Sequence, residues 1–121
     1  MTGNEVRLPL DGSGMSGELV VAPLVVAKLA GAEARATYGV VAMQSSPVRR
    51  LARLRRDALA DGVDVEAGDA GVRVSLHVVM ERGVNLAQVT VNLQEQVRYR
   101  LEQVTGIPVT DITVRVEDLQ D

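Results

Sequence analysis

Residues 71–118 read GVRVSLHVVMERGVNLAQVTVNLQEQVRYRLEQVTGIPVTDITVRVED and predict a strand, a long helix and a second strand. In residues 72–81 apolar side chains alternate with polar ones, which is the period of a strand with one buried face. The alternation returns in residues 112–117. Two strands that join one sheet through a helix run parallel, and such a crossover is right-handed. The stretch therefore predicts a right-handed C-terminal βαβ unit.

The intervening helix is predicted from apolar residues spaced three and four apart, which form one stripe along about five turns. Asn85 can accept a hydrogen bond from the first turn, and Gly106 and Pro108 suit the end of the helix. The stripe consists of Leu86, Val89, Leu93, Val97, Leu101 and Val104. The strand residues expected to face it are Val72, Val74, Leu76, Val78, Met80, Ile112, Val114 and Val116.

The preceding residues predict further elements of the same sheet. We expect strands in residues 17–22, 40–43 and 63–67, a helix in residues 23–38, and a weakly amphipathic segment in residues 48–60. The fold class is therefore α/β (α+β), a small mixed sheet with two main helices in the order β-α-β-(α)-β-β-α-β. The helices are expected on one face of that sheet.

The first helix and the chain ends complete this prediction. The helix has an apolar stripe of Val25, Leu29, Ala32 and Ala36, and its small residues Ala27, Ala30, Gly31 and Ala34 would let it approach a neighbour closely. Residues 1–16 are polar and contain glycine, so we expect a flexible N-terminal tail. Residues 17–118 are expected to form a single domain, and residues 119–121 a C-terminal tail.

Composition excludes several classes of function. The chain has 121 residues, enough for one domain, with no Phe or Trp and two Tyr, so aromatic platforms for single-stranded nucleic acid are almost absent. The net charge of −3 gives no overall attraction to nucleic acid or anionic lipid. The absence of Cys excludes disulfides, thiolate metal sites and cysteine nucleophiles. Without a signal-peptide pattern or a long apolar run, we expect a soluble cytoplasmic protein.

The sharpest charge feature is an arginine cluster, which consists of Arg49, Arg50, Arg53, Arg55 and Arg56. Five guanidinium groups in eight residues could bind phosphate groups, anionic lipid headgroups or an acidic protein surface. The plainer interpretation is a solvated helix face balanced by nearby carboxylates. Nucleic-acid binding is disfavoured, because neither aromatic residues nor a known reading motif accompanies the cluster. The arginine cluster is our candidate partner-binding site.

Three other features predict no cofactor, metal or catalytic site. Residues 12–17 match the G-x-G-x-x-G pattern, but a dinucleotide site needs that loop between a strand and a helix, and here it leads into a strand. His77 is the only histidine, has no second His or Cys to share a metal, and is interpreted as an inert residue on the less buried sheet face. We interpret Glu95, Glu102, Asp111, Glu117 and Asp118 as solubilising charges.

The order of these segments resembles the alkaline shock protein family of bacterial envelope-stress proteins over most of residues 17–118. The first part runs from Gly17-Glu-Leu-Val-Val through an Ala-rich helix to Tyr38-Gly-Val-Val-Ala-Met43. The second part contains Gly62-Val-Asp-Val-Glu66, Gly83-Val-Asn-Leu, a helix with Gln94 and Val97, and Val104-Thr-Gly-Ile-Pro-Val109. The resemblance closes on Ile112-Thr-Val-Arg-Val116 and matches the arginine-rich residues 48–60 poorly.

The resemblance implies a non-enzymatic cytoplasmic protein that is linked to envelope homeostasis under stress and has no catalytic or cofactor residues. Family members can lie at the inner face of the cell membrane by binding a small membrane-anchored partner, and they can self-associate. We therefore expect a homo-oligomeric interaction or scaffold protein that reaches the membrane through a protein partner without spanning it. The alternative is a small regulatory or RNA-associated protein that uses the arginine cluster. An enzyme comes third, because no residue pattern argues for one.

Overall fold

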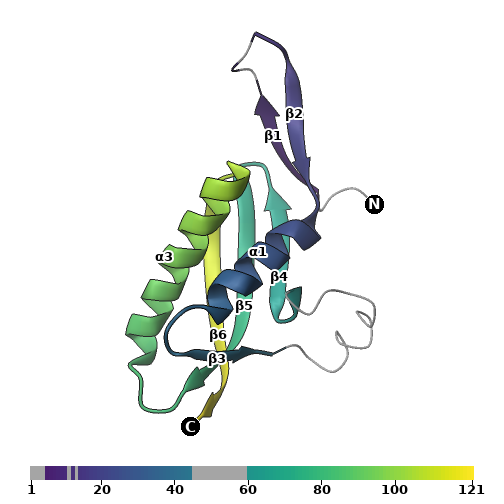
Figure 1. Ribbon diagram of the computed structural model, residues 1–121. Helices are drawn as coiled ribbons and strands as arrows, with labels where there is room; N and C mark the ends of the chain where they lie inside the picture. The colour runs from purple at the N-terminus through teal and green to yellow at the C-terminus, as the bar shows by residue number, and fades with distance from the viewer. Residues whose placement is uncertain (1–4, 11, 13, 45–59) are drawn as a thin grey trace.

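A computed structural model describes residues 5–10, 12, 14–44 and 60–121 (Figure 1). The described elements are β1 Val6–Leu10, β2 Gly17–Val21, α1 Pro23–Arg35, β3 Val40–Met43, β4 Val63–Gly68, β5 Gly71–Glu81, α3 Leu86–Thr105 and β6 Val109–Gln120. From β2 onward their order agrees with the predicted α+β arrangement. The amphipathic segment predicted in residues 48–60 lies, up to residue 59, outside the described residues.

Strand β5 is the centre of a four-stranded mixed sheet. β6 pairs with it in parallel, whereas β3 and β4 pair with it antiparallel. The His77 N–H donates to the Gly62 carbonyl (2.8 Å), and the His77 carbonyl accepts from the Gln44 N–H (2.9 Å). β3 and β4 therefore follow one another along the same side of β5, while β6 occupies the other side. Helix α3 joins β5 to β6, as predicted for the C-terminal unit.

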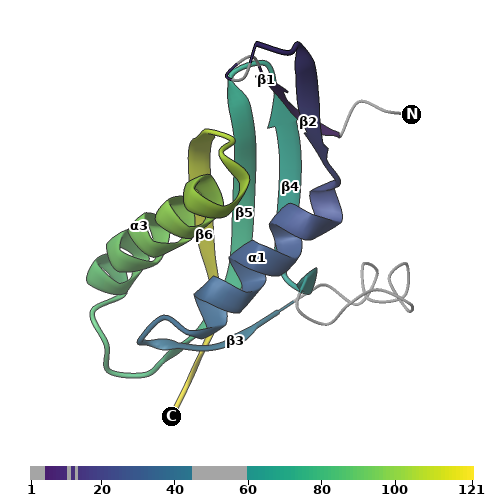
Figure 2. The same cartoon turned by 45° about the horizontal axis from the view of Figure 1, so that its top comes forward.

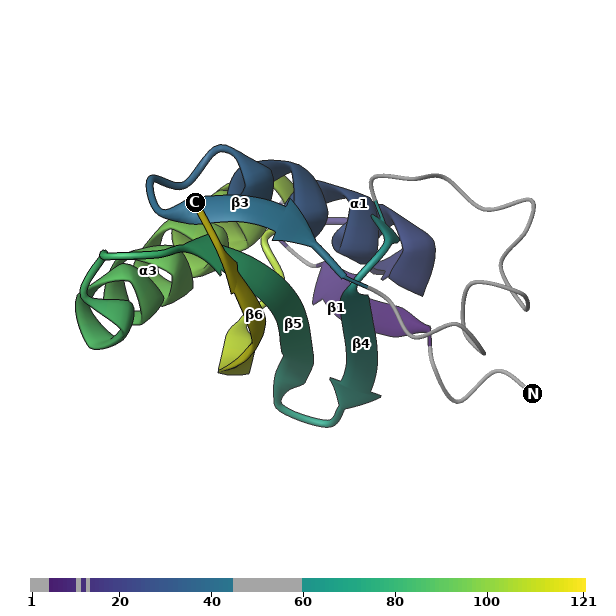
Figure 3. The ribbon, with the colours of Figure 1, turned by 90° about the horizontal axis from the view of Figure 1, so that it is seen from below.

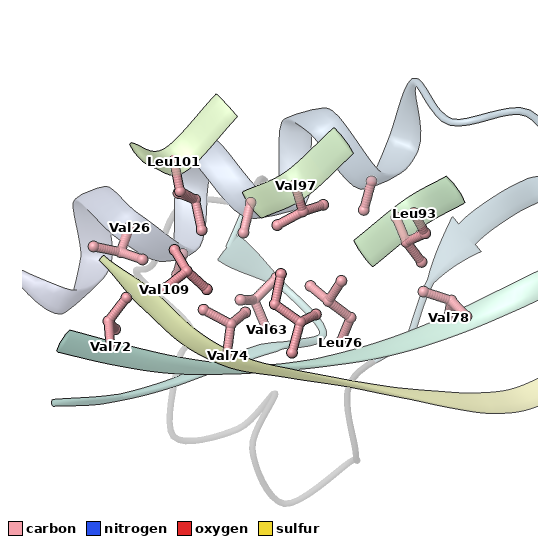
Figure 4. Close-up of a cluster of buried hydrophobic side chains, with 14 of the residues drawn as sticks. Val26, Val63, Val72, Val74, Leu76, Val78, Leu93, Val97, Leu101 and Val109 are labelled. Atoms are coloured by element: carbon pink, nitrogen blue, oxygen red, sulfur yellow. The ribbon is translucent and has the colours of Figure 1, made fainter. Parts of the chain in front are cut away.

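The hydrophobic core lies between this sheet and the two helices, which cover the same face (Figures 2 and 4). Leu76 and Met80 of β5 and Leu93 of α3 are fully buried, which confirms the predicted faces of both elements. The ends of the α3 stripe differ, since Leu86 is 38% exposed and Val104 is 51% exposed. Figure 2 shows α3 running at an angle to the strands of the sheet.

The predicted buried face of α1 was wrong for three of its four residues, whereas Leu29 is half-buried and packs against the core. Of that stripe Val25 is 46% exposed, and Ala32 and Ala36 are exposed as well. The helix instead buries Val26, Ala27, Ala30, Gly31 and Ala34. Four of these five residues are Ala or Gly, so α1 can lie close to α3 and to the sheet. The contacts made in this close approach outweigh the burial of larger apolar side chains at the other positions. The expected close approach through small residues is confirmed.

Strands β1 and β6 extend into the segments that were predicted as tails. Residues 6–10 form β1, which pairs antiparallel with β2 in a hairpin that projects beyond the main sheet (Figure 1). Val6 is 2% exposed and Leu8 packs against the core, so tertiary contacts anchor the base of this hairpin. At the other end β6 reaches Gln120, which pairs with Glu81 at the end of β5. Both terminal strands are therefore paired with a neighbouring strand.

Candidate functional site

The sheet face opposite the helices carries the polar half of each alternating strand. Its residues are Asp64 and Glu66 from β4, Arg73, Ser75 and His77 from β5, and Thr113, Arg115 and Glu117 from β6. The strand registers place Asp64 beside Ser75 and His77 beside Arg115. In Figure 3 both described helices lie on the far side of the sheet from this surface. We call it the open face.

His77 joins three strands on the open face. Its Nδ1 lies 2.8 Å from Glu117 Oε2 on β6, and its Nε2 lies 3.1 Å from Asp64 Oδ2 on β4. The three side chains are each about a quarter exposed, at 27%, 27% and 24% for His77, Asp64 and Glu117. Both ring nitrogens are therefore engaged by carboxylates from opposite sides.

The arrangement depends on protonation. A neutral imidazole has one N–H donor and one acceptor nitrogen, whereas an imidazolium has two donors. Only the protonated ring of His77 can therefore donate to Asp64 and Glu117 at the same time. The geometry makes His77 a proton-dependent link between β4 and β6.

Glu117 is held by two neighbours, His77 and Arg115. The hydrogen bond with His77 lowers the pKa of the Glu117 carboxyl, and Arg115, whose Nε lies 3.1 Å from Glu117 Oε2, lowers it further. Both neighbours favour the ionised carboxylate, which accepts their hydrogen bonds. Glu117 thus has a specific structural partner and is more than a solubilising charge.

This geometry does not suit metal binding or general-base catalysis. The described residues contain no group of His, Asp and Glu that could hold a metal ion. Asp64 and Glu117 sit on different ring nitrogens, so the three side chains do not converge on one point. A general base needs a nitrogen directed at a substrate, and each nitrogen of His77 already faces a carboxylate.

A hollow of about 890 Å³ lies along β4 and is lined both by the start of α1 and by residues of the sheet, including some of the open face. Asp64, Glu66, Arg73 and Asp111 supply charged groups to its lining. Arg73 and Glu66 form an ion pair across β4 and β5, and both side chains are more than half exposed. Such exposed pairs contribute little to stability, so their charges can be exchanged for those of a partner at small cost.

The sequence predictions bear on this site only in part. The arginine cluster, Arg49 to Arg56, lies outside the described residues, so its role stays a prediction. His77 was placed on the correct face, but the carboxylates beside it were missed. Asp64 is 13 residues before His77, and Glu117 is 40 residues after it. Each belongs to an alternating strand, yet only the pairing of those strands with β5 brings them together.

Among the described helices, none combines the length and apolar character needed to cross a bilayer.

Comparison with known proteins relates the chain to one family. Residues 12–120 match the alkaline shock protein 23 family, which is described as having a cell envelope-related function. An uncharacterised Streptococcus pyogenes protein is 32% identical over 99 residues, which cover 79% of this chain and 82% of that protein. The uncharacterised Bacillus subtilis proteins YloU and YqhY are 24% and 26% identical, each over 86% of this chain and over 89% and 78% of their own lengths. No solved structure matches the chain.

Proposed function

Because the chain belongs to the alkaline shock protein 23 family, whose function is related to the cell envelope, we propose that it is a non-enzymatic scaffold protein of the bacterial envelope stress response. In this proposal it is a cytoplasmic protein that self-associates. A small membrane-anchored partner recruits it to the inner face of the cell membrane. The names of the related proteins assign them no enzymatic activity.

The observation that carries the proposal is the open face. A sheet face that the described helices leave uncovered offers a broad polar surface, and its histidine is occupied by carboxylates on both nitrogens. Such a surface favours recognition of another molecule over chemistry on a substrate. It supports a scaffold, because a scaffold needs exposed area and fixed charges rather than a reactive group.

Self-association is proposed along the outer edge of β6. This strand pairs only with β5 among the described strands, and strand edges of this length can pair with another chain. Thr113→Lys places a charge on the exposed edge and should reduce the fraction of oligomer in light scattering after size exclusion. Gln103→Lys, an equally charged change on the exposed surface of α3, is the control and should leave the oligomer intact. Equal oligomer fractions in the two variants would contradict self-association through the edge of β6.

The arginine cluster is proposed to hold an acidic partner or the membrane surface. Reversing Arg49, Arg53 and Arg56 to Glu should reduce recovery of the protein in the membrane fraction, because the attraction to anionic groups is replaced by repulsion. Unchanged recovery of the variant in the membrane fraction would show that the arginine cluster is not needed for recruitment to the membrane.

A matched control separates this effect from a general change in net charge. Arg82, Arg98 and Arg100 are exposed residues of the described chain, and reversing all three changes the net charge equally. The control variant should be recovered with the membrane fraction as the parent protein is.

The experiment that tests the proposed function is a tagged pull-down from cells solubilised in mild detergent, with bound proteins and nucleic acid identified. Recovery of a small protein with a membrane span supports recruitment to the envelope. Strong retention of RNA that weakens as salt rises would instead favour the RNA-associated alternative, because phosphate contacts are salt-sensitive.

A further inference from the structure

Helix α3 covers only the first part of the outer edge of β6. Gln94 Nε2 donates to the Ile112 carbonyl at 2.9 Å, and Glu102 Oε2 accepts from the Val109 N–H at 2.9 Å. Two backbone groups near the start of β6 therefore already have partners on α3. Within the described chain, no side chain of α3 makes such a bond to β6 after Ile112.

The remainder of this edge, residues 113–119 of β6, is called the uncovered edge. The Ile112 carbonyl is directed at α3 rather than at β5, and backbone groups alternate in direction along a strand. The register of β6 against β5 is regular between Asp111 and Val116. The N–H and C=O groups of Val114 and Val116 therefore also point away from β5, where an added strand can pair with them.

The charges beside Val116 favour a second copy of β6 as that added strand. Arg115 and Glu117 flank Val116 on the open face, and Arg115 Nε lies 3.1 Å from Glu117 Oε2. In an antiparallel pair with Val116 opposite Val116 of the partner subunit, Arg115 lies opposite Glu117 of the partner subunit. By symmetry, Glu117 lies opposite Arg115 of the partner subunit. Opposite charges directly across two strands stabilise their pairing.

Other symmetric arrangements bring like charges together. An antiparallel pair centred on Arg115 places two arginines opposite one another. One centred on Val114 places Asp111 opposite Glu117 of the partner subunit. Parallel strands in register place each charge beside its own copy. Like charges directly opposite are destabilising, so the charge pattern selects Val116, which is also the midpoint of the uncovered edge.

We propose that two copies of the chain pair antiparallel through their uncovered edges, with Val116 on the two-fold axis. This inference rests on the proposed self-association and specifies its partner strand and its register. The two four-stranded sheets join into one continuous sheet. Arg115 of the partner subunit then extends the group of His77 and Glu117, so the two open faces form one polar surface.

Charge reversal tests the register in sedimentation velocity of the full chain. Arg115→Glu and Glu117→Arg should each raise the dimer dissociation constant about tenfold, because two cross-strand pairs change from attraction to repulsion. In an equal mixture of the two variants every pair again has opposite charges, so the affinity should return to that of the parent protein. Arg73→Glu makes the same charge change on β5, away from the edge, and should leave the dimer unchanged. A mixture that associates no better than either variant alone would overturn the proposal.

A distance measurement tests the same register without altering the edge. The chain has no cysteine, so Arg73→Cys on β5 accepts a single spin label. Arg73 pairs with Asp111, so the two labels should lie about 35–40 Å apart. Ten residues along the strand at about 3.4 Å each and three strand spacings of about 4.8 Å separate them. Pairing centred on Val114 predicts about 25 Å, and parallel strands in register predict about 15 Å.

These outcomes separate the register from the wider function. A dimer with either of the shorter label distances would overturn the proposed register and leave self-association in place. A parent protein that is monomeric in sedimentation would overturn both the register and self-association. Neither experiment uses the cellular partner, so a failed pull-down would count against recruitment to the membrane alone.

Discussion

Replacing Gly71 with Ala should destabilise the fold at the start of β5. Gly71 has a φ of +146°, a conformation that residues with a side chain rarely adopt. A Cβ atom there would overlap the Pro108 carbonyl oxygen and lie 3.0 Å from its carbon. That oxygen accepts a hydrogen bond from the Val72 N–H at 2.9 Å, which joins β5 to the beginning of β6.

The magnitude follows from these two effects. An unfavourable backbone conformation costs about 1–3 kcal/mol, and a lost hydrogen bond costs about 0.5–1.5 kcal/mol. The free energy of unfolding should therefore fall by about 1.5–4.5 kcal/mol in Gly71→Ala. With an m-value of about 2 kcal/mol/M, the urea midpoint should decrease by roughly 1–2 M.

The assay is urea unfolding followed by circular dichroism, with amide exchange of Val72 as a local readout. Gly17→Ala is the matched control, because a Cβ at Gly17 meets no atom within 4 Å. Its stability should stay within about 0.5 kcal/mol of the parent protein. The reasoning is refuted if both variants unfold at the same urea concentration, or if the Val72 amide of Gly71→Ala exchanges as slowly as in the parent.

Three further predictions concern the core, the open face and a buried hydroxyl. Leu93→Ala should lower the free energy of unfolding by about 2–5 kcal/mol, because Leu93 is fully buried. The control Val91→Ala changes a position that is 47% exposed and should alter the free energy of unfolding little. Equal losses of stability in urea unfolding would contradict the assigned buried face of α3. His77 lowers the pKa of Glu117 below its ordinary value of 4.5. The ionised carboxylate therefore stabilises the fold above pH 4.5, and this stabilisation is lost as the pH falls through the lowered pKa. Between about pH 5 and 3, the free energy of unfolding of Glu117→Gln, measured in urea titrations, should therefore fall less than that of the parent protein. An equal fall in both proteins would contradict this role of Glu117. Thr37→Val should lower the free energy of unfolding by about 1 kcal/mol in thermal or urea unfolding, because the buried Thr37 hydroxyl donates to Gln96 Oε1 at 2.9 Å. An unchanged free energy of unfolding would mean that this hydrogen bond makes no net contribution to stability.

Elements with strong local periodicity were predictable from the sequence. In β5 and β6 alternation identified the buried and polar faces, and in α3 the three- and four-residue spacing identified Val89, Leu93 and Val97 as core residues. Asn85 was expected to cap α3, and its side chain accepts a hydrogen bond from the Gln88 N–H at 3.0 Å. Each of these features depends on residues within a few positions of one another.

Features that depend on contacts across the chain were harder to predict. The buried face of α1 could not be inferred from the size of apolar side chains, because close packing with α3 selects the small ones such as Ala30 and Ala34. Strand β1 has only five residues, and its order depends on β2 and on the burial of Val6. In both cases the neighbour, and not the local pattern, determines which residues are covered.

The sequence by itself determined the α+β class, the order of the elements from β2 onward and the family of the protein, because periodicity, capping residues and motif order are properties of neighbouring positions. Only the tertiary structure decided that His77 lies between Asp64 and Glu117. Those carboxylates are 13 and 40 residues away, and the register of β4 and β6 against β5 sets their approach. Strand register arises from the packing of the whole sheet, so the charge environment of His77 is a property of the folded protein.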